Sequence, residues 1–220
     1  MQTIGAFSNV EIFDASTKLP TLSFLQQFDA ALVWSSDGQA FPLAAGLGDV
    51  LAQYWDSGGS VILTADAICL GKLTGRFASP GAGYMLIDGL ASIDTADDSL
   101  GTIYEPDSPL LADVSSLSAW QIPHSTGSVI NSGTTVAAWA KSWPLVVRGI
   151  KNGRPLVVLN MHPGSKLAGF GSGWWGDGAK LMRNAVLFSV CAPCGDKYSS
   201  AGKTGRAWKE HSFSNQLFTI

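Results

Sequence analysis

The stretch covering residues 28–71 constrains the fold of this chain more than any other. Residues 28–34 form an apolar run that is closed by serine, aspartate and glycine, as expected for a strand buried on both faces. Residues 48–56 carry apolar side chains at helical spacing, and Gly58-Gly59 ends the helix because glycine adopts the left-handed cap conformation at little cost. Residues 60–65 are again apolar and β-branched. Two buried strands joined by a helix predict a right-handed crossover between parallel neighbours.

The flanking segments extend this unit to an α/β sandwich of three layers, with a mostly parallel sheet and helices on both faces. A strand at residues 10–13 begins so early that we expect the first strand–helix unit of such a fold to be missing. We expect this strand and those at residues 30–34 and 61–63 to be parallel neighbours. Asn152-Gly153 predicts a hairpin between two later strands, because this dipeptide favours the tight turns of antiparallel pairs. The other predicted elements are a helix at residues 21–27 capped by Thr21, strands at residues 134–140, 145–150 and 155–160, and a helix at residues 177–190.

Composition limits the classes of function. The chain has 220 residues, of which 46% are apolar and 14% charged, with a formal net charge of −3, so residues 1–190 suffice for one well-cored domain. The absence of a basic stripe argues against a nucleic-acid partner, and no apolar stretch is long enough for membrane insertion. Residues 1–9 lack the basic start and apolar core of a signal peptide. No pattern indicates a cofactor, and none defines the oligomeric state.

Polar residues stand at the ends of the predicted strands, and the candidate ligand-binding residues are Asp14, Ser35, Asp37, Asp66 and His162. If the strands are parallel, their carboxyl ends share one edge of the sheet, where open α/β sheets bind their ligands. Carboxylate and imidazole groups at such an edge can bind hydroxyl groups or a metal ion. Aspartate and serine after a strand are also ordinary turn residues, so each candidate has a structural alternative.

Three phrases, DAALVWSSDG, GGSVILTA and PLVVLNMHPGS, occur in this order in the chain. Together they resemble the glutamine-amidotransferase-like flavodoxin-type fold, and most of all its trehalose-utilisation-like and other non-amidotransferase branches. The resemblance covers residues 10–190. It implies a non-catalytic binding or interaction domain whose ligand is a small molecule or a carbohydrate.

The same resemblance has a second interpretation, which is an enzyme. True amidotransferases carry a Gly-x-Cys-x-Gly nucleophile turn after a strand and a His-Pro-Glu segment after a later one, and this chain has Cys69 and His162 in matching order. The alternative is therefore a cysteine-dependent hydrolase or amidotransferase-like enzyme. Ala67 replaces the first glycine, and Gly164 replaces the glutamate that would orient the imidazole. We expect Cys69 to lie beyond hydrogen-bond reach of His162, with no glutaminase activity. A carboxylate from elsewhere that holds the imidazole, Asp66 for instance, would favour the enzyme interpretation.

The tail, residues 191–220, follows a different pattern. Cys191-Ala-Pro-Cys194, followed by Gly-Asp-Lys-Tyr-Ser-Ser, resembles the opening of an ephrin-receptor-like cysteine-rich repeat. This resemblance implies that the chain belongs to a larger extracellular protein. The alternative is that a lone Cys-x-x-Cys ends a helix by accident, and no dedicated zinc pattern accompanies it, so we predict no metal site. Residues after Tyr198 lack apolar periodicity, and we expect them to be poorly ordered and to pack little against the domain.

Overall fold

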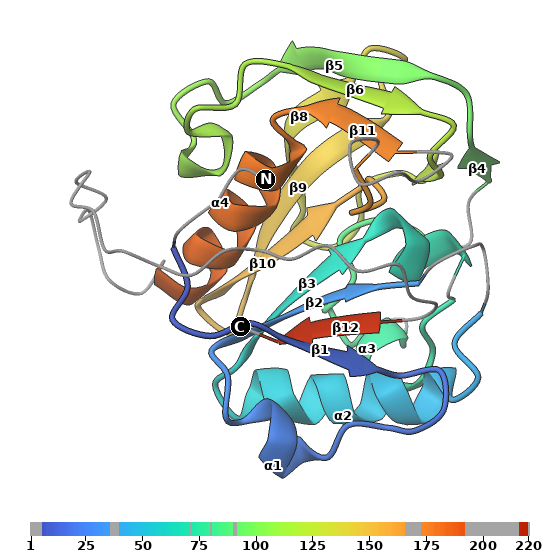
Figure 1. Cartoon of the computed structure of the whole chain (residues 1–220), viewed down its shortest axis with the longest axis vertical. Coiled ribbons are helices and arrows are strands. Elements are labelled where there is room, and N and C mark those ends of the chain that lie inside the picture. The colour runs from blue at the N-terminus through green and yellow to red at the C-terminus, as the bar shows by residue number, and fades with distance from the viewer. Residues whose placement is uncertain are drawn as a thin grey trace.

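The computed structural model describes residues 6–35, 40–70, 72–79, 81–89, 92–165, 173–191 and 216–219. These residues form helices and strands that surround two apolar cores (Figure 1). The helices are α1 (Leu22–Leu25), α2 (Ala44–Asp56), a π-helix (Asp66–Leu70), α3 (Gly75–Ala78), a 3-10 helix (Pro109–Leu111) and α4 (Gly178–Cys191). The strands are β1 (Glu11–Asp14), β2 (Ala30–Trp34), β3 (Ser60–Thr64), β4 (Ile93–Asp94), β5 (Asp98–Ile103), β6 (Leu117–Trp120), β7 (His124–Ser125), β8 (Thr134–Trp139), β9 (Pro144–Lys151), β10 (Arg154–Leu159), β11 (Gly173–Gly176) and β12 (Gln216–Thr219).

The central unit matches the sequence prediction. β2 and β3 are parallel neighbours, with Val33 opposite Leu63, and α2 connects them. The helix ends at Asp56, just before Gly58, whose φ of +116° lies in the left-handed region that favours glycine. β10 pairs in parallel with the other side of β3. The carboxyl ends of β2, β3 and β10 therefore share one edge of the sheet.

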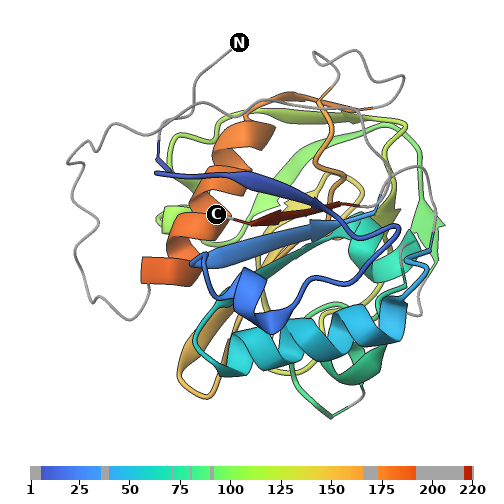
Figure 2. The same cartoon turned by 60° about the horizontal axis from the view of Figure 1, so that its bottom comes forward.

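Side chains of these three strands alternate between the two cores. On β2, Leu32 lies in one core with Leu181 of α4, and the next residue, Val33, lies in the other core with Leu51 of α2. β3 and β10 alternate in the same way. Figures 1 and 2 show α2 and α4 on opposite sides of these strands. Burial on both faces explains why the strands are continuous apolar runs in the sequence.

The large sheet is mixed, so the expectation of a mostly parallel sheet is wrong. Its strands lie in the order β1-β12-β2-β3-β10-β9-β8-β5-β6-β11, and among the described strands only β2–β3 and β3–β10 pair in parallel. Tight turns are one reason, because a two-residue turn can join only antiparallel strands. Asn152 and Gly153 form such a turn between β9 and β10, with φ of +50° and +75°, as the sequence predicted. The α/β class is confirmed, whereas the mostly parallel three-layer arrangement is not.

β12 lies inside the sheet, between β1 and β2, and pairs antiparallel with both. β1 and β2 therefore run in the same direction but are not neighbours, which corrects the predicted strand order. A strand at this place supplies ladder partners to the facing edges of both strands. For the four residues of β12, the expectation of little packing against the domain does not hold. The other expectations for the tail after Cys191 concern residues outside the described ranges.

Candidate functional site

Asp66 and His162 meet at the common edge of β3 and β10. Thr64 and Leu159, the last residues of these strands, are paired directly, so the segments that follow leave the sheet side by side. Nδ1 of His162 lies 2.5 Å from Oδ2 of Asp66. The side chain of Asp66 is 1% exposed and that of His162 is 14% exposed. A buried carboxylate thus holds a partly accessible imidazole.

This pair has the chemistry of an oriented imidazole. In the neutral ring, a proton on Nδ1 that is donated to the carboxylate makes Nε2 the acceptor nitrogen. Such a ring can bind a hydroxyl group or move a proton. Gly164 stands where amidotransferases carry the orienting glutamate, and Asp66 is the other carboxylate whose contact with the imidazole was expected to favour the enzyme. Asp66 does make this contact, since the parallel pairing of β3 with β10 brings together residues that are far apart in the sequence.

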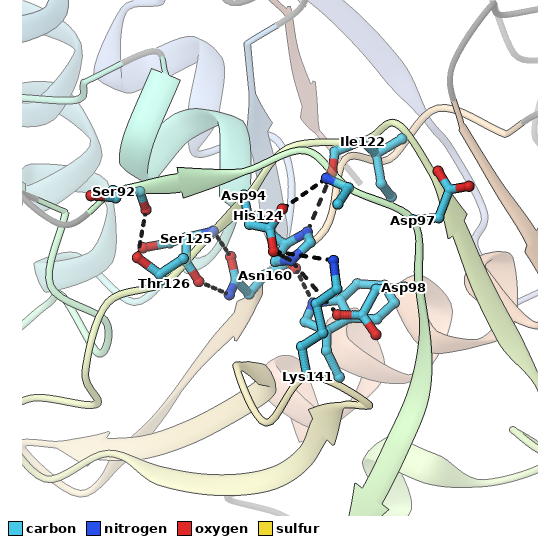
Figure 3. Close-up of polar contacts among 12 residues, drawn as sticks. Ser92, Asp94, Asp97, Asp98, Ile122, His124, Ser125, Thr126, Lys141 and Asn160 are labelled. Atoms are coloured by element: carbon cyan, nitrogen blue, oxygen red, sulfur yellow. Dashed lines mark hydrogen bonds and ion pairs between the residues drawn. The ribbon is translucent and has the colours of Figure 1, made fainter.

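Asn160 fixes the chain just before His162. Its buried side chain accepts from the Ser125 N–H at 2.7 Å and donates to the carbonyls of Ser125 and Pro144 at 2.8 and 2.7 Å. Figure 3 shows the amide of Asn160 beside Ser125. Trp139 Nε1 donates to the Asn160 carbonyl at 2.9 Å. These bonds attach the end of β10 to β7, β8 and β9.

The chain is also held just after His162. Trp174 of β11 donates from Nε1 to the Pro163 carbonyl at 2.9 Å and from its backbone N–H to the Gly164 carbonyl at 3.2 Å. Trp174 is itself buried. Anchored backbone on both sides of the imidazole fixes its position at the edge, which is a property of preorganised sites.

Of the other predicted ligand-binding residues, one stands at the same edge as the imidazole, one lies farther away, and one is outside the described residues. Ser35 is fully buried and follows β2, the neighbour of β3, so it stands at the same edge as the imidazole. Asp14 is the exposed last residue of β1, and its carboxylate accepts from the Ser16 N–H at 2.8 Å. β12 and β2 separate its strand from β3, a spacing of about 14 Å. Asp37 lies outside the described residues.

Cys69 lies within the π-helix, and its thiol makes a hydrogen bond. The S–H group donates to the Ala65 carbonyl at 2.9 Å, and the residue is buried. A nucleophile turn would come directly after β3, where Ala65 and Asp66 stand instead. The expectation that Cys69 lies beyond hydrogen-bond reach of His162 stays a prediction. Over the described ranges, no group of three His, Cys, Asp or Glu side chains is placed to hold a metal ion.

Sequence analysis missed a second polar cluster, centred on His124 of β7 (Figure 3). The ring is fully buried, and its Nε2 lies 3.8 Å from Oδ2 of Asp94 and 3.8 Å from Oδ2 of Asp98. Nδ1 lies 3.3 Å from the Ile122 carbonyl, and Lys141 Nζ lies 3.3 Å from Oδ2 of Asp94. Burial lowers the pKa of His124, and the two carboxylates offset this only in part. These residues come from separate segments with no common spacing, so no sequence pattern marks them.

Comparison with known proteins identifies the fold but no family. No protein-family model and no curated protein sequence matches the chain. The cytoplasmic protein STM3548 from Salmonella typhimurium matches 80% of this chain over 77% of its own length, with a TM-score of 0.57 and 11% identity. The cytoplasmic protein STM1381 from Salmonella typhimurium LT2 matches 77% of this chain over 75% of its own length, with a TM-score of 0.55 and 12% identity. At such low identity these likenesses show the fold alone.

Both of these similar structures are named as cytoplasmic proteins, which runs against the extracellular localisation expected from the tail. That expectation rested on one short motif beginning at Cys191, and we withdraw it. Within the described ranges, no helix has both the length and the apolar character that crossing a bilayer requires.

Proposed function

We propose that this chain is a binding domain for a small molecule that carries several hydroxyl groups, with Asp66 and His162 as the central contact. The observation that carries the proposal is the 2.5 Å contact between a buried carboxylate and a partly exposed imidazole. Its location supports a ligand site, because open α/β sheets bind ligands outside the carboxyl ends of parallel strands. The resemblance to trehalose-utilisation-like proteins supports a carbohydrate as the ligand class.

The groups at this edge suit a neutral hydroxylated ligand. The imidazole that Asp66 holds is partly exposed, so a hydroxyl group of the ligand can reach the ring. A neutral ligand brings no charge that would need a buried counter-ion. The anchored backbone on both sides of His162 lowers the cost of ordering the site when the ligand binds.

A hydrolase or amidotransferase-like enzyme is the second candidate, and one observation favours it. Asp66 supplies the orienting carboxylate that an imidazole base needs. The environment of Cys69 argues against this thiol as the nucleophile. Reactive cysteines are partly exposed thiolates, whereas this thiol is buried and donates to the Ala65 carbonyl. We therefore place ligand binding ahead of covalent catalysis.

The binding proposal is tested by titrating the full chain with glycerol, glucose or trehalose at millimolar concentration while the imidazole NMR signals of His162 are followed. We expect a saturable shift with at least one of these probes. Asp66→Asn, followed by the same signals, and His162→Gln, measured by isothermal titration calorimetry, should each weaken that binding about tenfold, or ~1.4 kcal/mol, because each removes one half of the contact. Asp14→Asn is the matched control, since it neutralises an exposed carboxylate at the end of another strand, and the Kd should not change.

Two results would contradict the proposal. The first is that none of the three probes shifts the His162 signals, and the second is that Asp66→Asn and Asp14→Asn bind alike. A glutamine-analogue chloroketone tests the enzyme candidate on the same protein. We expect mass spectrometry to find Cys69 unmodified. Alkylation of Cys69 that disappears in His162→Ala would assign the nucleophile and favour the enzyme.

A further inference from the structure

Two exposed tryptophans stand together on the outer face of the large sheet. Trp120 of β6 and Trp175 of β11 are 38% and 39% exposed, with ring centroids 6.2 Å apart and ring planes at 67°. Figure 1 shows their strands side by side at one end of the sheet. A pair of exposed rings in contact is typical of a binding surface, because exposing large apolar side chains to water is unfavourable.

The register of the strands explains why both rings lie on the outer face. Side chains alternate between the two faces of a strand, and Ala119 and Trp174, which are paired with each other, are buried in one apolar core. Ser118 is exposed and is paired with Trp175. This serine therefore shares the outer face with the two exposed rings.

Hydroxyl groups and a carboxylate stand beside the rings. Ser99 of β5 is paired with Ser118 and is exposed like it. Asp97 is also exposed, and its carboxylate accepts from the N–H of Gln121, the residue that follows Trp120. β5, β6 and β11 contain no lysine or arginine. The face therefore combines apolar rings with hydrogen-bond acceptors, and these strands add no positive charge.

The strand that carries Trp175 is fixed on both sides of it. Before this residue, Trp174 donates from Nε1 to the Pro163 carbonyl at 2.9 Å. After it, Asp177 accepts from the Ser116 N–H at 3.0 Å and donates from its own N–H to the Ser116 carbonyl at 2.7 Å. A surface that is ordered before its ligand arrives binds at a lower entropic cost.

The same strand is attached to the segment that carries His162. The Trp174 N–H donates to the Gly164 carbonyl at 3.2 Å. Followed through this bond at 3.8 Å per residue, the Cα atoms of His162 and Trp175 are within about 20 Å of each other. The two exposed tryptophans are therefore neighbours of the candidate site.

We propose that Trp120 and Trp175 form a stacking site for a neutral sugar ring. The inference deepens the proposed function and rests on it for the ligand class, since both sites would take a hydroxylated molecule. The C–H face of a pyranose ring is apolar and can be buried against an indole ring. The hydroxyl groups at its rim can donate to the oxygens of Asp97 and Ser118.

Other ligands suit this face less well. A nucleotide could also stack on tryptophan, but Asp97 repels its phosphate and the three strands supply no cation. A quaternary ammonium ion is attracted to aromatic rings and to a carboxylate. It has no hydrogen to donate, however, so it leaves the hydroxyl groups of Ser99 and Ser118 unused.

An NMR titration of the full chain with methyl β-glucoside tests the stacking site through the indole signals of its eight tryptophans. Single Trp→Phe variants assign Trp120 and Trp175, and we expect a saturable shift of both signals at millimolar concentration. Sorbitol is the matched probe, because this open-chain polyol has no rigid C–H face, and it should leave both signals in place. The imidazole signals of His162, recorded in the same titration, report on the candidate site separately, so failure of one site is distinguished from failure of the other.

Variants test whether the rings bind the sugar. Trp175→Ala should weaken the binding of methyl β-glucoside about fivefold, followed by the Trp120 signal, because one aromatic surface is lost. Trp175→Phe should retain part of the affinity, since a smaller ring remains. Tyr104→Ala is the matched control, because it removes another exposed aromatic ring, 56% exposed, beyond the other end of β5. The Kd should not change in that variant.

Three results would overturn the stacking site. The first is that methyl β-glucoside shifts neither indole signal, and the second is that sorbitol shifts them equally. The third is that choline shifts them where the glucoside does not, which would assign the face to a quaternary ammonium ion. Equal affinity in Trp175→Ala and the unchanged chain also contradicts the proposal. If that variant fails to fold, the comparison of glucoside with sorbitol on the unchanged chain decides.

Discussion

The amide of Asn160 uses its oxygen and its nitrogen in a fully buried position. Its partners are backbone groups of Ser125 on β7 and of Pro144 on β9. Asparagine suits this position because one short side chain supplies both an acceptor and two donors. The residue therefore joins the strand that leads to His162 with the strand that carries His124, and a change here should affect the fold before it affects any ligand.

Asn160→Asp should lower the free energy of unfolding by roughly 2–4 kcal/mol, because a carboxylate would face the carbonyls of Ser125 and Pro144 with no proton to donate. Urea unfolding at neutral pH measures the change. Asn152→Asp is the matched control, since it makes the same replacement in an exposed hairpin turn that also accepts aspartate. Its effect should stay within about 0.5 kcal/mol, and equal losses in the two variants would contradict the role of Asn160.

Part of the candidate site could be predicted from the sequence. Asp66 and His162 were expected at one edge, because each follows an apolar run that is recognisable by itself. Their direct contact was not, because it depends on β10 lying beside β3, and local spacing carries no information on strand order. The sequence predicts a strand that ends at Asn160, and no spacing in the sequence indicates a partner for His124. Their contacts join segments that are distant in the sequence and have no common periodic pattern.

At the scale of elements, the start of α4 is stabilised by a loop that is distant in sequence. Asp177 stands just before Gly178 and accepts from the N–H groups of Ser115 and Ser116 at 2.9 and 3.0 Å and from Lys180 Nζ at 2.7 Å. Burial alone would raise the pKa of Asp177, but these bonds hold it well below its usual range. A negative charge at a helix N-terminus is also favourable.

Asp177→Asn should lower the free energy of unfolding by about 1–2 kcal/mol at neutral pH. Since the folded-state pKa of Asp177 is lowered, the carboxylate stabilises the fold above its unfolded-state pKa of about 3.9, and this contribution is lost as the pH falls through the folded-state pKa. The difference in the free energy of unfolding between Asp177→Asn and the unchanged chain should therefore narrow below about pH 4. Urea unfolding in acid and at neutral pH would show this. Asp107→Asn, at an exposed position, should leave the free energy of unfolding unchanged at either pH. A loss in Asp177→Asn that does not depend on pH would contradict this account.

Elements with a strong apolar pattern could be predicted, and short polar strands could not. β2, α2, β3 and the β9–β10 hairpin were expected from periodicity and from the Asn-Gly turn. β5 and β6 were not assigned. β5 has a register shift between Leu100 and Ile103, which interrupts any alternation of side chains, and β6 has four residues. Such segments become strands because neighbouring strands pair with them, not because of their own pattern.

For the whole molecule, the expected parallel order failed because later segments pair with edges that the prediction left open. β12 occupies the position between β1 and β2, and the antiparallel strands β9, β8, β5, β6 and β11 extend the sheet beyond β10. Which strand pairs with which edge is decided by tertiary packing. Local periodicity in the sequence carries no information on this pairing.

A chain shortened to residues 1–191 should melt at a temperature roughly 5 °C or more below that of the full chain, because loss of β12 leaves the facing edges of β1 and β2 without ladder partners. Circular dichroism measures the two transitions. A synthetic peptide of residues 212–220, added in excess, should restore part of the lost melting temperature. The same peptide with Phe218→Pro should not, because proline lacks the N–H group of a ladder. Equal melting temperatures for the two chains would show that β12 does not stabilise the sheet.

The position of β12 also sets an order of events during synthesis. Among the described strands, β1 pairs with β12 alone, and β12 follows α4 in the chain. As the polypeptide leaves the ribosome from its amino end, β2 and β3 can pair early, whereas β1 has no partner until β12 emerges. One edge of β2 therefore stays open until β12 has been synthesised. Chaperones that shield unpaired strand edges should accordingly matter more for the nascent chain than for the finished protein.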